Sequence, residues 1–328
     1  MHKVLRGIAA ASILSVVFLC TACSAGASPP AAGTNGHASK IVFIPGTIGD
    51  PFYVSMRCGA QAEATAEGAT LTTQAATTFS APLQVPILNS VVASKPDAIL
   101  IAPTDSTALE APIAQAKAQG IKMVLVDTTL KDPSAAVSSI SSDNTAGGKA
   151  AFTAIKQLVP NGGKVLVVAV QPGVSTDDLR VGGFESAIKA DPSYQYLGAQ
   201  YSQQDAAKAA SIVNAELQKT PDIAAIFATN DLAALGAATG IRQAGKQQQV
   251  KLVGFDAETD QVAALRAGTV QALIAQQPSV IGADAVKQAI KAIKGQQTTR
   301  SIKTKFTIIT KANLDTAAGK NAIYQTNC

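Results

Sequence analysis

Short apolar runs alternate with alanine-rich amphipathic stretches from residue 40 to about residue 293. The runs have the length and composition of strands, at 40–44, 69–73, 98–101, 122–126 and 137–141, then at 164–170, 194–201, 224–229, 250–255 and 270–275. Stretches between them, such as 54–67, 107–119, 145–158, 206–219 and 231–244, have helical periodicity. Alternating strands and helices favour parallel sheets covered by helices on both faces. Two series of runs, separated near 142–148, predict an α/β chain of two similar lobes with a cleft between them.

Four of the apolar runs end in a side chain that forms hydrogen bonds. These side chains are Asp127, Asn230, Asp256 and Gln276. In open α/β sheets, ligands bind at the carboxyl ends of the strands, so these groups are expected to line a polar cleft. The set contains two carboxylates and two amides, without a histidine, a thiol or a paired nucleophile and base. The set therefore favours binding a polyhydroxylated molecule over catalysing its reaction.

Asp50 follows the first strand and precedes a predicted helix whose first residue is Pro51. This position is typical of a helix cap, which is one interpretation. The other places Asp50 in the cleft with Phe52 and Tyr53, because aromatic faces cover the C–H side of a sugar while carboxylates accept its hydroxyl protons.

Arg180 falls early in a predicted helix, where a cation is unfavourable for the helix dipole. It therefore needs another reason to be there. One candidate is an ion pair with Asp177 or Asp178, or with Asp127 or Asp256 across an empty cleft. The other is a ligand, since a guanidinium can grip two adjacent oxygens at once; we favour the ligand.

Composition excludes several classes of function. The net charge of +5 falls to +3 without residues 1–22, because Lys3 and Arg6 are removed and no acidic residue is. The remaining positive charge is too weak and too scattered to predict nucleic-acid binding. The histidines, His2 and His37, both precede the predicted fold, so histidine catalysis and histidine metal sites are not expected. We expect no cofactor, no metal and no catalysis.

The N-terminal segment has the pattern of an export signal. Lys3 and Arg6 precede an apolar run over 8–20, and small residues follow before Cys23. We predict a signal peptide over 1–22, cleavage before Cys23 and a lipid on its thiol, because the segment resembles a bacterial lipoprotein box. The alternative is an ordinary secretory signal cut nearby; either exports the protein. Residues 23–39, rich in Ser, Ala, Gly and Pro, are typical of a flexible linker.

This processing changes the cysteine count. Cys20 is discarded with the signal and Cys23 carries lipid, which leaves Cys58 and Cys328 as an even pair in an oxidising compartment. We predict a disulfide that ties the C-terminal tail to the first helix. The alternative is two unrelated thiols.

Motifs along residues 40–309 resemble the ribose-binding family of periplasmic sugar-binding proteins, which share their fold with lactose-repressor-type effector domains. The motifs begin at strand ends and helix starts in the family's order: Asp50-Pro-Phe-Tyr53, Ala102-Pro-Thr-Asp-Ser106, Ser142-Asp-Asn144, Arg180-Val-Gly-Gly-Phe184, Ala228-Thr-Asn-Asp231, Val253-Gly-Phe-Asp256 and Ile274-Ala-Gln276. The resemblance implies a type I periplasmic binding protein, in which two Rossmann-like lobes with parallel sheets, joined by three crossovers, close on a sugar.

The resemblance also implies boundaries and a ligand set. The N-terminal lobe would comprise 40–142 plus 277–304, the C-terminal lobe 143–276 plus 305–310, and 311–328 would be a tail returning to the N-terminal lobe. The ligand-binding residues would be Asp50, Phe52, Tyr53, Asp127, Ser142, Gln171, Arg180, Gln204, Asn230, Phe255, Asp256 and Gln276. Departures from the ribose binder at Gly46, Ala102, Thr128, Gln171 and Gln204 favour a polyol, a furanose or another small monosaccharide over ribose itself.

The sequence therefore predicts the extracytoplasmic solute-binding component of an ABC-type importer, which captures a monosaccharide or sugar alcohol by hinge closure. Its partner would be a membrane permease, and the protein would be a monomer, lipid-anchored on the outer face of the bacterial cytoplasmic membrane. One alternative is a ligand-sensing protein of the same fold, chemosensory or regulatory. A second is a secreted enzyme acting on sugars, with Asp127 and Asp256 as its acid/base pair.

Overall fold

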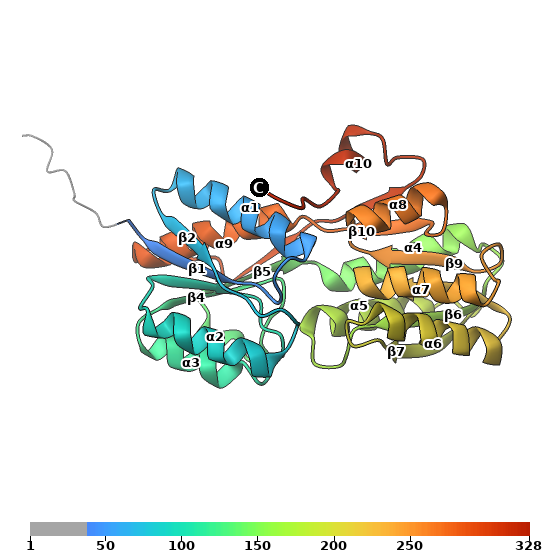
Figure 1. Ribbon diagram of the computed structural model, residues 1–328, viewed down its shortest axis with the longest axis horizontal. Helices are drawn as coiled ribbons and strands as arrows, with labels where there is room; N and C mark the ends of the chain where they lie inside the picture. Colours follow the sequence, from blue (N-terminus) through green and yellow to red (C-terminus); the bar gives the residue numbers. More distant parts are fainter. Residues whose placement is uncertain (1–37) are drawn as a thin grey trace, which may run out of the picture. The chain divides into compact units, whose positions relative to one another are not determined.

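The computed structural model describes residues 38–328, which alternate between strands and helices up to α9 (Figure 1). The predicted signal peptide, the lipidation site Cys23 and nearly all of the predicted linker lie outside the described residues. Within them the strands form two six-stranded sheets. The predicted α/β class with two parallel-dominated sheets is confirmed.

The first sheet has the strand order β11-β5-β4-β3-β1-β2, with every neighbouring pair parallel. Its strands are β1 (Lys40–Ile44), β2 (Thr70–Thr73), β3 (Ala98–Ile101), β4 (Lys122–Val126), β5 (Ser138–Ser142) and β11 (Ser301–Thr304). The elements around it are α1 (Pro51–Ala66), α2 (Ala81–Ala93), α3 (Glu110–Ala118), η1 (Pro133–Ala135) and α9 (Pro278–Ile293). All of β3 is buried, as a central parallel strand covered on both faces requires.

The second sheet repeats this order as β12-β10-β9-β8-β6-β7, with one antiparallel pair, β10 with β12. Its strands are β6 (Gly163–Ala169), β7 (Tyr194–Tyr201), β8 (Ile223–Ala228), β9 (Lys251–Phe255), β10 (Ala272–Ala275) and β12 (Thr307–Thr310). Its helices are α4 (Asn144–Leu158), α5 (Ser175–Ile188), α6 (Ala206–Lys219), α7 (Asp231–Gln243) and α8 (Thr259–Ala267). The chain passes between the sheets after β5, after β10 and after β11.

Helices α4 and α5 approach closely because a glycine of each helix faces the backbone of the other. In the α4–α5 pair, a Cβ on Gly148 would lie 2.1 Å from the Arg180 carbonyl oxygen, and one on Gly183 would lie 2.2 Å from the Thr145 carbonyl oxygen. Contacts this short leave no room for a side chain. The glycines therefore allow α5 to pack closely on α4. This packing sets the position of Arg180, which lies on α5.

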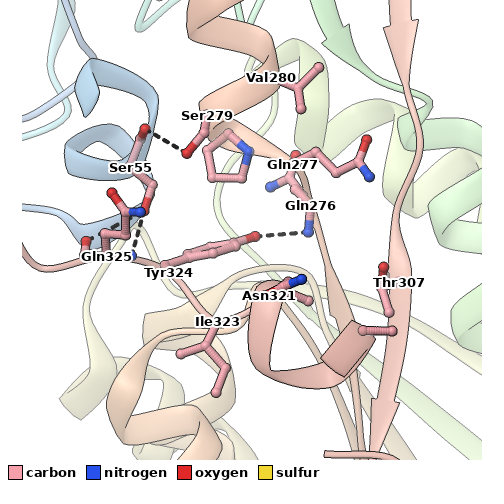
Figure 2. A pocket seen from close by; sticks show the side chains of 13 residues that line it. Ser55, Gln276, Gln277, Ser279, Val280, Thr307, Asn321, Ile323, Tyr324 and Gln325 are labelled. Atoms are coloured by element: carbon pink, nitrogen blue, oxygen red, sulfur yellow. Dashed lines mark hydrogen bonds between the residues drawn. The ribbon is translucent and has the colours of Figure 1, made fainter. Parts of the chain in front are cut away.

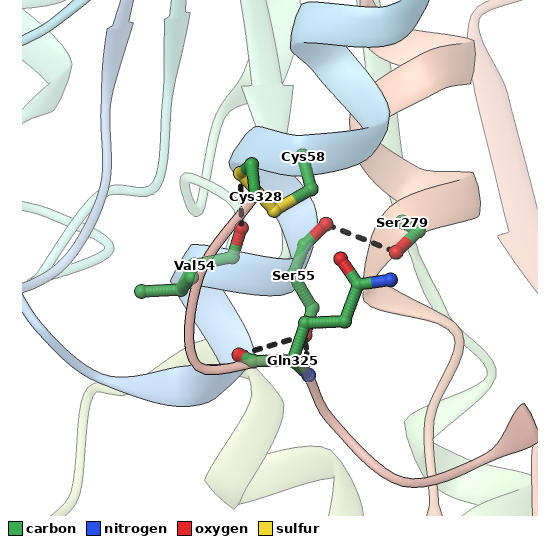
Figure 3. Close-up of a disulfide and its surroundings, with 6 residues drawn as sticks. All are labelled: Val54, Ser55, Cys58, Ser279, Gln325 and Cys328. Carbon is green, nitrogen blue, oxygen red and sulfur yellow. Dashed lines mark hydrogen bonds between the residues drawn. A yellow bond between two sulfur atoms is a disulfide. The ribbon is translucent and has the colours of Figure 1, made fainter. Parts of the chain in front are cut away.

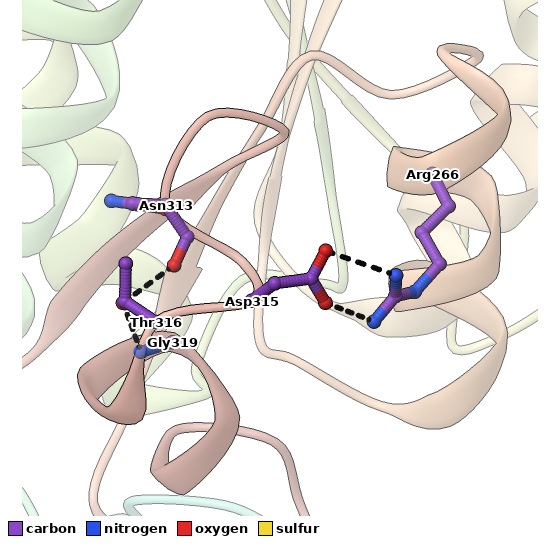
Figure 4. A network of polar contacts seen from close by, with 5 residues as sticks. All are labelled: Arg266, Asn313, Asp315, Thr316 and Gly319. Carbon is purple, nitrogen blue, oxygen red and sulfur yellow. Dashed lines mark hydrogen bonds and ion pairs between the residues drawn. The ribbon is translucent and has the colours of Figure 1, made fainter.

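The C-terminal tail follows β12, forms the short helix α10 (Ala317–Asn321) and ends beside α1. There the Sγ atoms of Cys328 and Cys58 are bonded at 2.04 Å, with the two Cα atoms 5.4 Å apart (Figure 3). Earlier in the tail, Asp315 forms an ion pair with Arg266 of α8 at 2.8 Å (Figure 4). Among residues 38–328, no helix is long and apolar enough to cross a membrane.

Candidate ligand-binding cleft

The carboxyl ends of strands from both sheets surround a cavity of about 50 Å³. Its lining includes all four of the polar side chains predicted at strand ends. The lining residues are Asp50, Phe52, Tyr53, Phe79, Asp127, Val170, Val174, Thr176, Asp177, Arg180, Gln204, Asn230, Asp231, Asp256, Glu258 and Gln276. The cavity is small and its lining is mainly polar, which suits a small polar molecule.

Asp127 and Asp256 occupy equivalent places in the two sheets, directly after β4 and directly after β9. Both have a left-handed backbone, with φ of 60° and 79°, which aspartate tolerates better than most side chains do. Their amide groups donate to the next strand, to Ile140 at 2.8 Å and to Ile274 at 2.9 Å. This shared turn directs one carboxylate from each sheet into the cavity.

Both carboxylates are held by neighbours. The Tyr53 hydroxyl donates to Asp127 at 2.8 Å, and the Gln276 amide donates to Asp256 at 2.7 Å. Gln276 also accepts a hydrogen bond from the Ser142 hydroxyl at 2.8 Å, which links the end of β10 to the end of β5. The carboxylates are thus oriented before any ligand arrives, which lowers the cost of ordering them on binding.

Arg180 is fixed by contacts that leave much of its guanidinium free. Its Nε donates to Asn144 at 2.9 Å and its Nη1 to the Thr229 carbonyl oxygen at 2.7 Å. The guanidinium carbon lies 3.8 Å from the centroid of the Phe255 ring, a cation–π contact. A guanidinium has five N–H donors, so up to three remain for a ligand.

The ion-pair explanations for Arg180 do not fit the described residues, because no carboxylate oxygen among them lies within 4.0 Å of its nitrogens. Asp177 instead accepts from the Val170 amide at 3.1 Å and from the Thr229 hydroxyl. The ligand explanation for Arg180 stays a prediction.

The cavity is acidic, with Arg180 as the one cation among the lining residues of the described chain. Loss of hydration on burial raises the pKa of Asp127 to about 7, although Arg180 and the Tyr53 hydroxyl oppose the shift. Burial and the nearby charge of Asp256 raise the pKa of Asp50 to about 6. Burial with neighbouring carboxylates raises the pKa of Asp231 to about 8 and that of Glu258 to about 10. Near neutral pH the wall is therefore a mixture of acceptors and protonated donors, which suits hydroxyl groups.

Most of the residues proposed from the sequence line the cavity, namely Asp50, Phe52, Tyr53, Asp127, Arg180, Gln204, Asn230, Asp256 and Gln276. Asp50 also caps α1, since its side chain accepts from the Phe52 backbone amide at 2.8 Å. It therefore caps the helix and lines the cavity at the same time. Gln204 is held by the Asn230 amide at 2.5 Å.

Three proposed residues lie outside the lining. Phe255 is fully buried beneath the Arg180 guanidinium, and Ser142 is fully buried behind Gln276. Gln171 is half-buried and contributes nothing to the cavity wall. In this arrangement Phe255 and Ser142 support lining residues rather than facing the cavity themselves.

Sequence reasoning missed several lining residues: Phe79, Val170, Val174, Thr176, Asp231 and Glu258, with Asp177 considered only as a partner for Arg180. Asp231 and Glu258 stand within two residues of predicted strand-end groups, a signal that could have found them. Phe79 lies between β2 and α2, where no periodicity marks it. Gly46 makes room for it, because a Cβ there would lie 2.5 Å from the Phe79 ring and 2.6 Å from the Tyr53 hydroxyl.

Two α/β lobes that meet at a polar cavity between strand ends define a ligand-binding protein of the type I periplasmic class. A family model described as "Periplasmic binding protein domain" matches residues 41–297, and the chain belongs to this family. The predicted resemblance is thereby confirmed, and the family is one of substrate-binding proteins of transporters.

Similar proteins bind sugars according to their names. The ribose import binding protein of Bacillus subtilis is 32% identical over 291 residues, which cover 87% of this chain and 93% of that protein. An ABC transporter solute-binding protein from Agrobacterium vitis, solved with alpha-D-tagatopyranose, is 40% identical with a TM-score of 0.86, and the match covers 88% of this chain and 99% of the other. A second one from that organism, solved with D-fucose, is 30% identical with a TM-score of 0.81, covering 87% and 100%.

Proposed function

We propose that this protein is the extracytoplasmic solute-binding component of an ABC-type importer and that it captures a monosaccharide or sugar alcohol in the cavity. One observation carries the proposal. Asp127, Asp256 and the free donors of Arg180 converge on a small cavity from two sheets. Carboxylates and a guanidinium together satisfy hydroxyl groups as both donors and acceptors. The sugar-binding relatives support the same ligand class.

Each lining group has a role in the proposal. Asp127 and Asp256 accept hydroxyl protons, and Arg180 donates to ligand oxygens. Phe52 and Phe79 cover the C–H face of the ring. Hydrogen bonds to charged groups contribute about 1.5–3 kcal/mol each, so a few of them offset the costs of ordering the site and closing it. Phe255 and Ser142 act through Arg180 and Gln276.

Closure follows from the division of the site between sheets. Asp127 belongs to the first sheet and Asp256 to the second, so a ligand that contacts both stabilises the closed form and shifts the hinge equilibrium. The lobes would move as units with the boundaries predicted from the sequence, 40–142 plus 277–304 and 143–276 plus 305–310. The closed form is the one that a permease would recognise.

Export, the lipid on Cys23 and a monomeric state complete the proposal, supported by the N-terminal pattern and by the exported class of the relatives. Mass spectrometry of the mature protein tests the first two, since a diacylglycerol-modified Cys23 gives a defined N-terminal mass. An N-terminus elsewhere would replace the lipoprotein with an ordinary secreted protein. Light scattering gives the oligomeric state.

A thermal-shift screen of the folded chain tests the ligand class. The panel contains D-ribose, D-allose, D-tagatose, D-fucose, tetritols, pentitols and inositols. A sugar that binds only the folded state raises its melting temperature in a saturable way. Saturable stabilisation without turnover supports the proposal. Product formation would favour the enzyme alternative, and no shift with any member would contradict sugar capture.

A further inference from the structure

The tail beyond β12 contacts both lobes. On the second lobe, Asp315 pairs with Arg266, and the Tyr324 amide donates to the Ala257 carbonyl oxygen at 3.0 Å. One residue later the tail is bound to the first lobe, where the Gln325 amide donates to the Ser55 hydroxyl at 2.6 Å. The tail therefore connects the lobes a further time, and the Cys58–Cys328 bond closes this connection covalently.

The Tyr324 side chain reaches the back of the ligand site. It is 5% exposed, and its hydroxyl donates to Asp256 Oδ1 at 3.0 Å. The same hydroxyl accepts from the backbone amide of Gln276 at 2.9 Å (Figure 2). Asp256 and Gln276 line the ligand cavity, whereas Tyr324 does not and borders a second hollow of about 360 Å³ between the tail and the start of α9, which Gln276 also lines. Tyr324 thus acts on the site from outside the cavity.

A parallel with the first lobe indicates what this contact does. There the Tyr53 hydroxyl donates to Asp127, the strand-end carboxylate equivalent to Asp256. Both tyrosine rings pack on Phe52, with centroid distances of 5.1 Å for Tyr53 and 5.8 Å for Tyr324. Each carboxylate is oriented by a tyrosine, but only the second tyrosine comes from the tail.

We propose that Tyr324 is a positioning residue of the ligand site and that the disulfide-closed tail is a strap limiting how far the lobes open. Because Asp256 is a ligand-binding residue only under the proposed function, the Tyr324 part of the inference rests on that function. The strap depends on the disulfide and on the contacts that dock the tail, and not on the ligand.

The length of the strap sets its effect. Four Cα–Cα steps join Tyr324, docked on the second lobe, to Cys328, bonded to α1, and a fully extended chain spans at most ~3.3–3.6 Å per residue. The strap therefore stops extending at roughly 13–14 Å. Wider opening requires Tyr324 to leave Asp256, so the strap couples the hinge angle to the geometry of the site.

Small-angle X-ray scattering of the ligand-free protein tests the strap. Mass mapping first establishes the Cys58–Cys328 bond, and free thiols in the exported protein would overturn the proposal. We expect a larger radius of gyration for the Cys58→Ser/Cys328→Ser double variant than for the native protein. If that variant unfolds, insertion of Gly-Ser-Gly-Ser after Thr326 keeps the bond and lengthens the strap, with the same expected shift. An unchanged radius of gyration in a folded variant would overturn it.

Tyr324→Phe tests the positioning role, because it keeps the ring and removes the hydroxyl. With the best sugar of the thermal-shift panel, we expect affinity to fall about 10-fold, because Asp256 is then less well oriented for the ligand; this equals about 1.4 kcal/mol, less than the full worth of a hydrogen bond to a charged group. Tyr196→Phe, a half-buried tyrosine of β7 outside the cavity, is the matched control and should bind normally. Equal affinity in Tyr324→Phe and the native protein would overturn the role.

Titration of the Asp256 carboxyl by carbon NMR gives a readout without ligand. Burial raises the pKa of this carboxyl, while Arg180 and the hydrogen bonds from Gln276 and Tyr324 lower it. Tyr324→Phe should therefore raise the midpoint, against the unchanged background of the other carboxylates in the cavity, Asp50, Asp127, Asp231 and Glu258. An unmoved midpoint would refute the contact. If no sugar binds the native protein, the proposed function fails while the scattering and titration results still decide this inference.

Discussion

Replacing Arg180 by alanine removes the one cation among the residues that line the cavity in the described chain. Up to three of its N–H donors are available to a ligand, and a fork of two donors on adjacent oxygens is the usual guanidinium geometry. Hydrogen bonds to charged groups are worth about 1.5–3 kcal/mol each, so two lost bonds cost about 3–6 kcal/mol. At about 1.4 kcal/mol for each factor of ten, affinity should fall roughly 100- to 10,000-fold.

The assay is calorimetric titration of the sugar that gives the largest thermal shift. Arg242→Ala, which removes an exposed arginine from α7 of the same lobe, is the control and should bind as the native protein does. Arg180→Lys separates charge from geometry, since it keeps the cation and loses the fork. A dissociation constant within threefold of the native value in Arg180→Ala would refute the role assigned to this residue.

Replacing Arg180 by alanine should also lower the stability of the fold. Arg180 holds the Thr229 carbonyl oxygen and the Asn144 side chain, both of which are buried. Leaving a buried polar group unpaired costs about 1–3 kcal/mol, less where water enters the emptied cavity. Circular dichroism should therefore show a folded protein with a lower melting temperature, so weak binding in this variant reflects the site.

Three other outcomes follow from the packing and charge of the cleft. Gly183→Ala should destabilise the fold by about 1–3 kcal/mol in urea titrations, because its Cβ would lie 2.2 Å from the backbone of α4. Gly182→Ala is the control and should be neutral or stabilising, because no atom lies within 4 Å of the added Cβ. Equal effects of the two substitutions would contradict the packing argument. Burial raises the pKa of Asp127 to about 7 and that of Asp231 to about 8, so the ligand-free fold binds protons more readily than the unfolded chain, and its stability should fall as pH rises from about 4 to about 8. A urea midpoint that rises over this range would rule that out. Phe79→Ala should weaken sugar binding about 3- to 10-fold by calorimetry, as the loss of one aromatic face predicts, and no change would remove Phe79 from the ligand surface.

The strand-end residues could be predicted because periodicity locates the ends of parallel strands and topology brings those ends together. Asp127, Asn230, Asp256 and Gln276 all line the cavity for this reason. The unfavourable position of a cation early in a helix pointed to Arg180, whose place depends on the packing of α5 on α4. A strand end and a position early in a helix are both features of regular secondary structure, which the sequence pattern reveals.

The sequence could not show which residues face the cavity and which lie behind its lining. Phe255 ends a strand as Asp256 begins the turn, yet one lies under the guanidinium and the other in the cavity. Phe79 enters from a segment without periodicity, through space left by Gly46. Tyr324 lies in the tail, where Cys328 predicted a tie to the first helix but nothing predicted a contact with the cleft. These positions depend on contacts between residues far apart in the chain.

The left-handed turn that follows β4 and β9 bears on ancestry. The same strand order occurs in both sheets, and in both an aspartate with positive φ follows the equivalent strand and donates its amide to the next one. A backbone conformation that few side chains adopt is a stringent mark to find twice at matching positions. Duplication of a single half would give both the shared strand order and the shared turn. The two halves are nevertheless unequal at the cavity, because Arg180 lies on one side only.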